Sequence, residues 1–153
     1  MQAARQNLSA EELLEIHREV REQALADPAS RYEDPAGQGP SVSRVQAIVG
    51  ANPALGVVER AAWILRAIVL VQPFPDGNHR TGLLAAELLL GRDGIRFRPS
   101  PDAAAEFQRK VSSERFARLR GYDDAPLSVL VEWNDQVMAC CLDFIHKTVD
   151  EIG

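Results

Sequence analysis

Polar and conformationally special residues interrupt the most apolar part of the chain. The segment Gln72–Thr81, with the sequence QPFPDGNHRT, lies between two mostly apolar runs at 57–71 and 81–90. Its two prolines favour an extended backbone, and Asp-Gly-Asn is typical of a tight turn. Because the turn leads directly into a helical pattern, the free N–H groups and the positive dipole end of that helix would lie in the loop. Such a helix start binds phosphate readily, so the segment predicts a phosphate site.

Three side chains of the segment fit that chemistry. Arg80 falls in the first turn of the helix and carries the forked donors that suit phosphate oxygens. Asp76 offers the oxygen ligand that Mg²⁺ prefers beside phosphates. Phe74 is the one aromatic residue of the loop and would anchor it to the core. For Asp-Gly-Asn alone, a simple connection between two helices is the better interpretation, whereas the complete ordered string favours a functional loop.

The flanking elements must hold this loop in place. The segment 57–71 is apolar on nearly all sides and predicts a helix at the centre of a bundle. The run 81–90, rich in Leu and Ala, predicts a second buried helix that ends at Gly91 and Gly94. We therefore expect two mutually packed central helices with the loop between them.

The rest of the chain also has helical periodicity, and no alternating strand pattern is found. A capping box at Ser9–Glu12 predicts a helix over 10–25. Ser41 or Ser43 would begin a short helix through Val49. Further helices are predicted from Ser100-Pro101 to about Leu119 and from Pro126 to about Ile152. The prediction is a single all-α domain, 1–153, of about six or seven helices, with a loop or short hairpin near 30–40.

The loop resembles the signature of the Fic/Doc (Fido) family, His-x-Phe-x-Asp/Glu-Gly/Ala-Asn-Gly/Lys-Arg. The match consists of Phe74, Asp76, Gly77, Asn78 and Arg80. The segment 13–17 is also similar to the opening helix of Doc-like members. The resemblance spans most of the chain, although only the loop is specific.

This resemblance implies roles for the loop residues. Asp76 would hold Mg²⁺ against the phosphates of ATP, and Gly77, Asn78, His79 and Arg80 would bind phosphate. The loop near 30–40 would be the flap that holds a target segment. The implied reaction moves a phosphoryl or nucleotidyl (AMP-type) group from a nucleoside triphosphate to a Ser, Thr or Tyr hydroxyl of a protein.

Three residues depart from the family pattern. Gln72 stands where the family keeps its catalytic histidine, and an amide has no basic site near neutral pH. Losing a general base typically lowers a rate about 10²–10⁴-fold; His79 is a weaker candidate for a substitute base than for a phosphate contact. His79 at the Gly/Lys position and Leu83 at the position of a second arginine are more similar to the Doc branch than to AMP-transferring members.

Bulk properties limit the partners. The formal net charge is -5, which argues against general binding to nucleic acid or to anionic membranes. No signal segment or membrane-spanning stretch is expected. The adjacent Cys140 and Cys141 predict small buried residues in a reducing compartment. We therefore expect a cytoplasmic protein.

His17 is predicted to be a structural histidine. The segment 92–120 holds eight basic against four acidic residues, which favours a solvated helical face over a docking surface for an acidic partner.

Two functions remain open at this stage. The first is a Doc-like transferase whose activity Gln72 reduces or abolishes. The second is a non-catalytic module of the same fold that binds nucleotide or a partner protein. A glutamine introduced to inactivate a toxic enzyme would give the same sequence. No inhibitory Ser/Thr-x-x-x-Glu-Gly/Asn motif is present, so inhibition would require a separate antitoxin.

Overall fold

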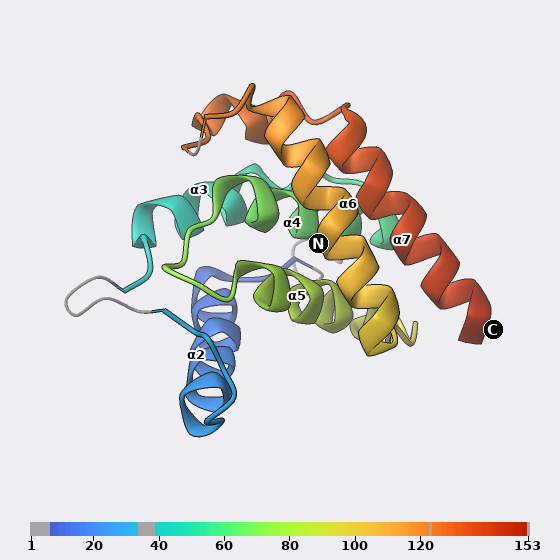
Figure 1. Cartoon of the computed structure of the whole chain (residues 1–153). Helices are drawn as coiled ribbons and strands as arrows, with labels where there is room; N and C mark the ends of the chain where they lie inside the picture. The colour runs from blue at the N-terminus through green and yellow to red at the C-terminus, as the bar shows by residue number, and fades with distance from the viewer. Residues whose placement is uncertain (1–6, 34–38, 123, 153) are drawn as a thin grey trace.

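The computed structural model describes residues 7–33, 39–122 and 124–152, and in these ranges the regular elements are all helices (Figure 1). Their bounds are α2 Ala10–Ala26, α3 Val42–Ala51, α4 Val57–Val71, α5 Asn78–Arg92, α6 Pro101–Arg118, the 3-10 helix η1 Leu127–Leu130 and α7 Gln136–Ile152. The predicted all-α fold is thus confirmed. Of the predicted flap, residues 34–38 lie outside the described chain, and its remaining residues form neither helix nor strand.

Local signals explain where several helices begin. Ser9 and Glu12 form the predicted capping box, in which each side chain accepts from the other's backbone N–H. Ser41 caps α3 by accepting from Arg44 N, and Ser100 caps α6 by accepting from Ala103 N. These helix starts therefore follow from short-range sequence.

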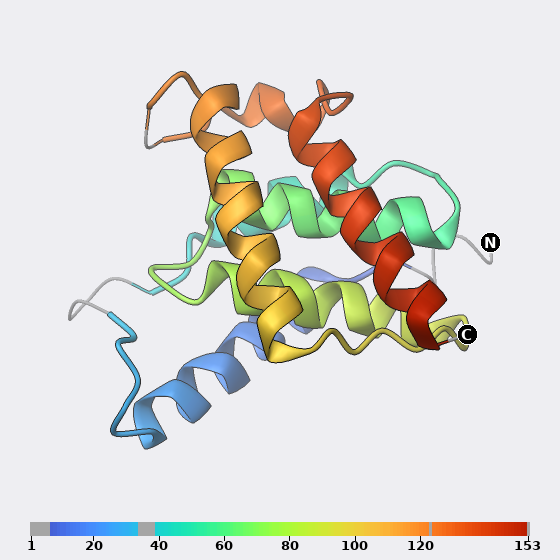
Figure 2. The same cartoon turned by 45° about the vertical axis from the view of Figure 1, so that its right-hand side comes forward.

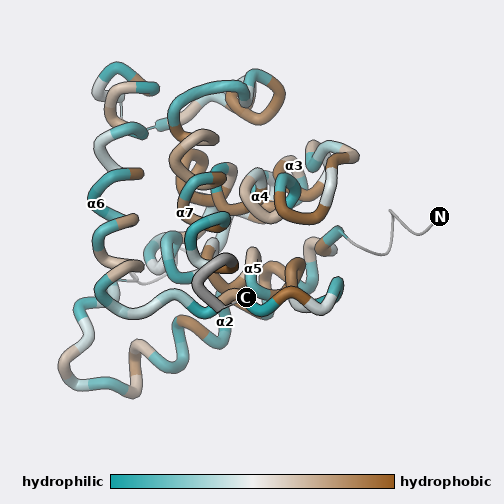
Figure 3. The backbone as a smooth tube through the Cα atoms, turned by 90° about the vertical axis from the view of Figure 1, so that its right-hand side faces the viewer, coloured by the Kyte–Doolittle hydropathy of each residue, from teal (hydrophilic) through white to brown (hydrophobic). Residues whose placement is uncertain are grey.

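The helices α4 and α5 lie side by side in the middle of the molecule. In Figures 1 and 2, α6 and α7 cover them on one side, and α2 packs against α5 on the other. Every residue from Arg60 to Val71 is buried, which confirms α4 as a central helix. Figure 3 shows hydrophobic residues along α4 and mostly hydrophilic ones along α6.

A glycine permits the close packing of the two central helices. A Cβ added at Gly82 of α5 would lie 2.9 Å from Leu65 Cδ1 of α4. Real carbon atoms do not approach so closely without a shift of one of them. The absence of a side chain at Gly82 therefore leaves room for Leu65 between the two central helices.

The prediction that one helix runs from Pro126 to Ile152 is wrong. Pro126 instead precedes the short helix η1, and α7 begins only at Gln136. Arg66 of α4, which is fully buried, donates to Val129 O (2.7 Å) and Glu132 O (3.1 Å). These carbonyl groups therefore find their donors outside a continuous helix.

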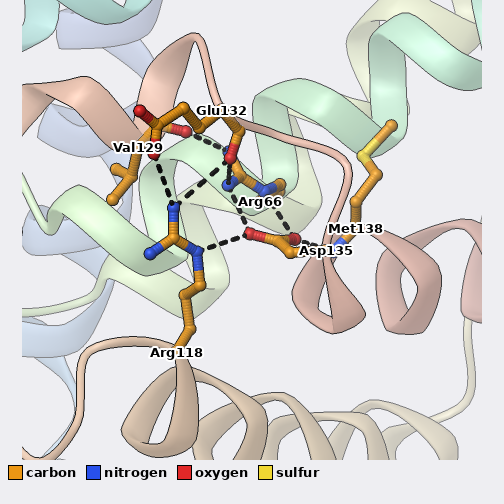
Figure 4. Close-up of polar contacts among 6 residues, drawn as sticks. All are labelled: Arg66, Arg118, Val129, Glu132, Asp135 and Met138. Carbon is orange, nitrogen blue, oxygen red and sulfur yellow. Dashed lines mark hydrogen bonds and ion pairs between the residues drawn. The ribbon is translucent and has the colours of Figure 1, made fainter.

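The same arginine organises the start of α7 (Figure 4). Arg66 also pairs with Asp135, its Nη2 lying 2.6 Å from Oδ2. Asp135 in turn accepts from Met138 N (2.9 Å), as an N-cap residue does, and receives Arg118 Nε at 3.1 Å. One buried guanidinium thus joins α4 to the segment that breaks the predicted helix.

The basic segment 92–120 is only partly a solvated face. Lys110 makes the expected i,i+4 pair with Glu106 (3.2 Å). By contrast, Arg92 pairs with Glu12 of α2, and Arg118 pairs with Asp135. Several of these charges therefore connect elements that are distant in sequence.

The structure bears on the predictions made for the two cysteines and for membrane-spanning segments. Cys141 is buried and Cys140 half-buried, both as free thiols, and burial raises the pKa of each. None of the helices in the described part of the chain combines the length and apolar composition needed to cross a bilayer.

Candidate functional site

The side chain of Asn78 closes the loop between α4 and α5. Its Oδ1 accepts from Phe74 N (3.2 Å) and its Nδ2 donates to Phe74 O (3.0 Å). Asn78 is 8% exposed and Phe74 only 4%. Both polar atoms of the Asn78 side chain therefore bind the backbone of Phe74, and the main-chain N–H of Asn78 is the group that could bind an anion.

His17 of α2 contacts two residues of the loop, Phe74 and Asp76. Its ring stacks on Phe74 with centroids 4.1 Å apart and an interplanar angle of 7°. Its Nε2 lies 3.1 Å from Asp76 O and 3.0 Å from the hydroxyl of Tyr32. The histidine is buried, at 3% exposed, and its contacts are those of a structural residue, as predicted.

Asp76 links the loop to the residues that precede the proposed flap. Its Oδ1 accepts from Gly77 N and its Oδ2 from Glu33 N, both at 2.7 Å. Each carboxylate oxygen can accept more than one bond, so both retain acceptor capacity. The carboxylate is partly exposed and could bind a cation from the solvent side.

Gly77 starts α5 in a conformation that favours glycine. Its φ is 74°, in the left-handed region, and an added Cβ would lie 3.1 Å from Val20 Cγ1 and 3.3 Å from Tyr32 Cε2. The first backbone bond of the helix runs from Thr81 N to Gly77 O (2.9 Å). The N–H groups of Asn78, His79 and Arg80 precede that bond and have no partner within the helix.

Gln72 ends α4 at the other side of the loop. It is exposed and has a φ of 50°, a left-handed conformation that is uncommon for glutamine. Two arginines hold the last carbonyl groups of the helix: Arg115 Nε donates to Leu70 O (3.2 Å) and Arg44 Nη1 to Val71 O (3.4 Å). Positive charge at this end complements the helix dipole.

His79 lies in the first turn of α5 and is partly buried. Its Nδ1 is enclosed and has no hydrogen-bond partner in the described part of the chain. Burial lowers the pKa of His79 below its ordinary value of 6.5, and the nearby charge of Arg115 lowers it further. The imidazole is therefore less cationic at neutral pH than a free histidine.

Arg80 is exposed, and its Nη2 donates to Gln23 Oε1 of α2 (2.7 Å). The guanidinium has further donors, so phosphate could bind without displacing every existing contact. Each of the predicted site residues thus lies in the loop or the first turn of α5. Asp76, Asn78 and Arg80 all have protein partners in this structure.

The residues present fit Mg²⁺ and a polyphosphate. No cluster of three or more His, Cys, Asp or Glu side chains suited to a metal occurs among the described residues. Mg²⁺ is commonly held by one or two carboxylates while phosphates and water fill its other positions. Asp76, beside the N–H groups of α5 that have no partner within the helix, matches that arrangement.

Sequence reasoning missed the residues that support the loop from other helices. Arg44 of α3 and Arg115 of α6 bind the last carbonyl groups of α4, next to the loop, and Gln23 of α2 accepts from Arg80. Arg115 and Arg44 look like ordinary surface arginines in the sequence. Only the position of His17 within an apolar helix face hinted that it faces inward.

Comparison with known proteins identifies the family of the chain. A family model described as Fic/DOC family matches residues 7–90, which is more than half of the chain and runs from just before α2 to within α5. The chain therefore belongs to the Fic/DOC family.

A Fido domain-containing protein of Dictyostelium discoideum is 36% identical over 74 residues, which make up 46% of this chain and 50% of that protein. The chain thus spans about half the length of this curated relative. No solved structure matches the chain.

Proposed function

We propose that this protein binds Mg²⁺ and a nucleoside triphosphate such as ATP at the loop 72–80. It then transfers a phosphoryl or nucleotidyl (AMP-type) group to a protein hydroxyl, at a rate limited by Gln72. The observation that carries the proposal is the juxtaposition of Asp76 with the N–H groups at the start of α5, which have no partner within the helix, with Arg80 in the same turn. Family membership supports the same function.

Each loop residue has a physical role in this proposal. The N–H groups of Asn78, His79 and Arg80 and the guanidinium of Arg80 bind phosphate oxygens. Asp76 would hold Mg²⁺, which would neutralise charge that develops on the phosphates. Phosphoryl transfer depends mostly on such positioning and charge neutralisation, so a site without a strong base can retain activity.

Gln72 limits the rate because it cannot remove a proton. The target hydroxyl oxygen bonds to phosphorus while the bond to the departing phosphate breaks, and the hydroxyl proton must leave. A histidine would take that proton, whereas the amide of Gln72 can only orient the hydroxyl by hydrogen bonding. We therefore expect a rate lower by about 10²–10⁴-fold than that of the same site with histidine.

His79 and Leu83 support a Doc-like rather than an AMP-transferring site. His79 occupies the position where the Doc branch has lysine, and no second arginine stands at position 83. Because its pKa is lowered, His79 would act on phosphate as a neutral donor, or would take up a proton when the anion binds. The favoured reaction is therefore transfer of the γ-phosphoryl group.

A second function is favoured by three features of the site. Asp76 and Arg80 are bonded to Glu33 and Gln23, and Gln72 offers no base. A non-catalytic module that binds nucleotide or a partner protein would tolerate all three features. Under either function we expect a cytoplasmic protein, where ATP is available. Inhibition of the transferase would require a separate antitoxin.

The test compares transfer by the natural protein and by Gln72→His, with Gln72→Ala as a matched control. Each protein is incubated with Mg²⁺, cell lysate and ATP labelled at either the α- or the γ-phosphate. We expect weak labelling by the natural protein and labelling stronger by about 10²-fold or more for Gln72→His. Label retained only from the γ-phosphate indicates phosphoryl transfer, and label from the α-phosphate indicates nucleotidyl transfer.

Calorimetric titration with ATP and Mg²⁺ separates the two functions. Binding that Asp76→Ala or Arg80→Ala abolishes, without labelling by Gln72→His, identifies the non-catalytic module. If the natural protein binds no ATP and neither substitution changes the titration, both nucleotide functions are wrong.

A further inference from the structure

The outer face of α5 carries an apolar ridge between two hollows. Leu84 and Leu88 line a hollow of about 610 Å³ next to α2, together with Ile16. The same two leucines line a second hollow of about 470 Å³ next to residues 91–98. Leu88 is 37% exposed. The ridge therefore stands between two surfaces that no described element of the chain covers.

The walls of the two hollows carry opposite charge. Four glutamates of α2 line the first hollow: Glu11, Glu12, Glu15 and Glu19. Three arginines line the second, namely Arg92, Arg96 and Arg98, with Glu87 beside them. The ridge thus has an acidic wall on one side and a mostly basic wall on the other.

Part of this charge is neutralised within the chain. Glu12 pairs with Arg92 across one end of the ridge, and Glu15 pairs with Arg18. Among the described residues, Glu11 and Glu19 on the acidic wall have no ion-pair partner, and neither do Arg96 and Arg98 on the basic wall.

We propose that this face is the interface of a homodimer in which the ridge of one copy packs on the ridge of a second copy. A two-fold axis parallel to α5 places the acidic wall of each protomer opposite the basic wall of its partner. Glu11 and Glu19 then face Arg96 and Arg98 of the other copy, twice over, because an isologous contact repeats itself. The leucines meet at the centre, and the charges form the rim.

A second copy suits this surface better than a partner of a single charge sign. An acidic or a basic partner would complement one wall and meet like charge at the other, which disfavours the contact. A second copy offers the reverse pattern, because it carries an acidic and a basic wall on either side of the same ridge. The proposal does not depend on nucleotide binding or catalysis.

The test uses charge reversal and sedimentation velocity of the full chain over a concentration series. The natural protein is expected to form dimers whose dissociation constant rises with added salt. The variants Glu11→Lys/Glu19→Lys and Arg96→Glu/Arg98→Glu should each weaken self-association by at least about tenfold, because like charges would then face each other. Mixed in equal amounts, the two variants should form a heterodimer, since one is basic on both walls and the other acidic on both.

Two further variants separate packing from charge. Leu88→Glu should also abolish the dimer, whereas Leu25→Glu, which changes another exposed leucine at the end of α2, should not. Circular dichroism checks that each variant is folded. A natural protein that remains monomeric at every concentration overturns the proposal. So does a dimer that survives Leu88→Glu, or a pair of charge-reversed variants that do not associate when mixed.

Discussion

Replacing Asp76 by asparagine tests whether this carboxylate holds the residues that lead into the proposed flap. The two oxygens of Asp76 accept from Gly77 N and Glu33 N at 2.7 Å each. The two amides contact different oxygens of Asp76, and asparagine has an NH₂ group in place of one of them, so in the same orientation it accepts from only one of these amides. Gly77 is its neighbour in the chain, so we expect the Gly77 contact to persist and the Glu33 contact to be lost.

The structure sets the size of this effect. A hydrogen bond to a charged group contributes about 1.5–3 kcal/mol, and the exposed position of Glu33 places this bond at the lower end. About 1.4 kcal/mol corresponds to a tenfold change in an equilibrium constant. The Glu33 amide should therefore exchange its hydrogen about tenfold faster in Asp76→Asn, as measured by NMR under conditions where exchange reports local opening.

The matched control is Glu33→Gln, which alters the side chain but keeps the backbone N–H that makes the bond. Its residue 33 amide should exchange at nearly the natural rate. Equal exchange in Asp76→Asn and the natural protein would refute the reasoning, because the carboxylate would then not hold this segment in solution.

Three other changes have defined expectations. Arg66→Met removes one partner of a buried ion pair and should lower the free energy of unfolding in urea by about 3–5 kcal/mol. Arg118→Met, at a side chain 28% exposed, should lower it by about 1 kcal/mol or less. Similar losses in the two variants would contradict the central role of Arg66 in holding Asp135. The pKa of His79 is lowered in the folded protein, so the unfolded chain takes up this proton more readily, and the free energy of unfolding should fall as the pH drops below about 6.5. Denaturation at pH 7.5 and pH 5.5 measures this fall, which should be smaller in His79→Gln. Gly77→Ala should lower the free energy of unfolding, measured by thermal denaturation, by about 1–2 kcal/mol because residue 77 has a positive φ. Gly91→Ala, at a helical site with open space, should raise the same free energy by up to about 1 kcal/mol.

The helices of this fold were predictable because their signals are local. The capping box at Ser9 and the serine caps at Ser41 and Ser100 each involve residues no more than three apart. The continuous apolar run at 57–71 could be satisfied only by burial on all sides. Where neighbours in sequence determine the structure, sequence reasoning placed the element correctly.

The start of the last helix was not predictable for the opposite reason. Pro126 and the apolar stripe that follows are compatible with one uninterrupted helix. The break depends on Arg66, about sixty residues earlier, which binds Val129 O and Glu132 O. No local pattern reveals that a buried guanidinium will take these carbonyl groups.

The candidate site also has a part that was predictable from local sequence and a part that was not. The loop itself is contiguous, so the order of Phe74, Asp76 and Arg80 could be read directly from the sequence. The supporting contacts of Arg115 and Gln23 join residues 45 and 57 positions apart. Their roles became apparent only when the helices were placed in space.

The contact between Arg80 and Gln23 raises a question that binding measurements can decide. Arg80 Nη2 donates to Gln23 Oε1 at 2.7 Å in an exposed contact between α5 and α2. A phosphate is a charged acceptor and forms stronger bonds to guanidinium than a neutral amide does. If the amide merely competes with phosphate, Gln23→Ala should leave the affinity for ATP and Mg²⁺ unchanged or raise it by up to about fivefold, which corresponds to about 1 kcal/mol.

Arg80→Ala is the reference for this comparison, with an expected loss of affinity of at least about tenfold because a charge-assisted bond to phosphate disappears. Calorimetric titration of both variants distinguishes competition from support. If Gln23→Ala weakens binding as strongly as Arg80→Ala does, then Gln23 orients the guanidinium toward the phosphate. In that case the arrangement described here is the one that binds nucleotide, and α2 is part of the site rather than an obstacle to it.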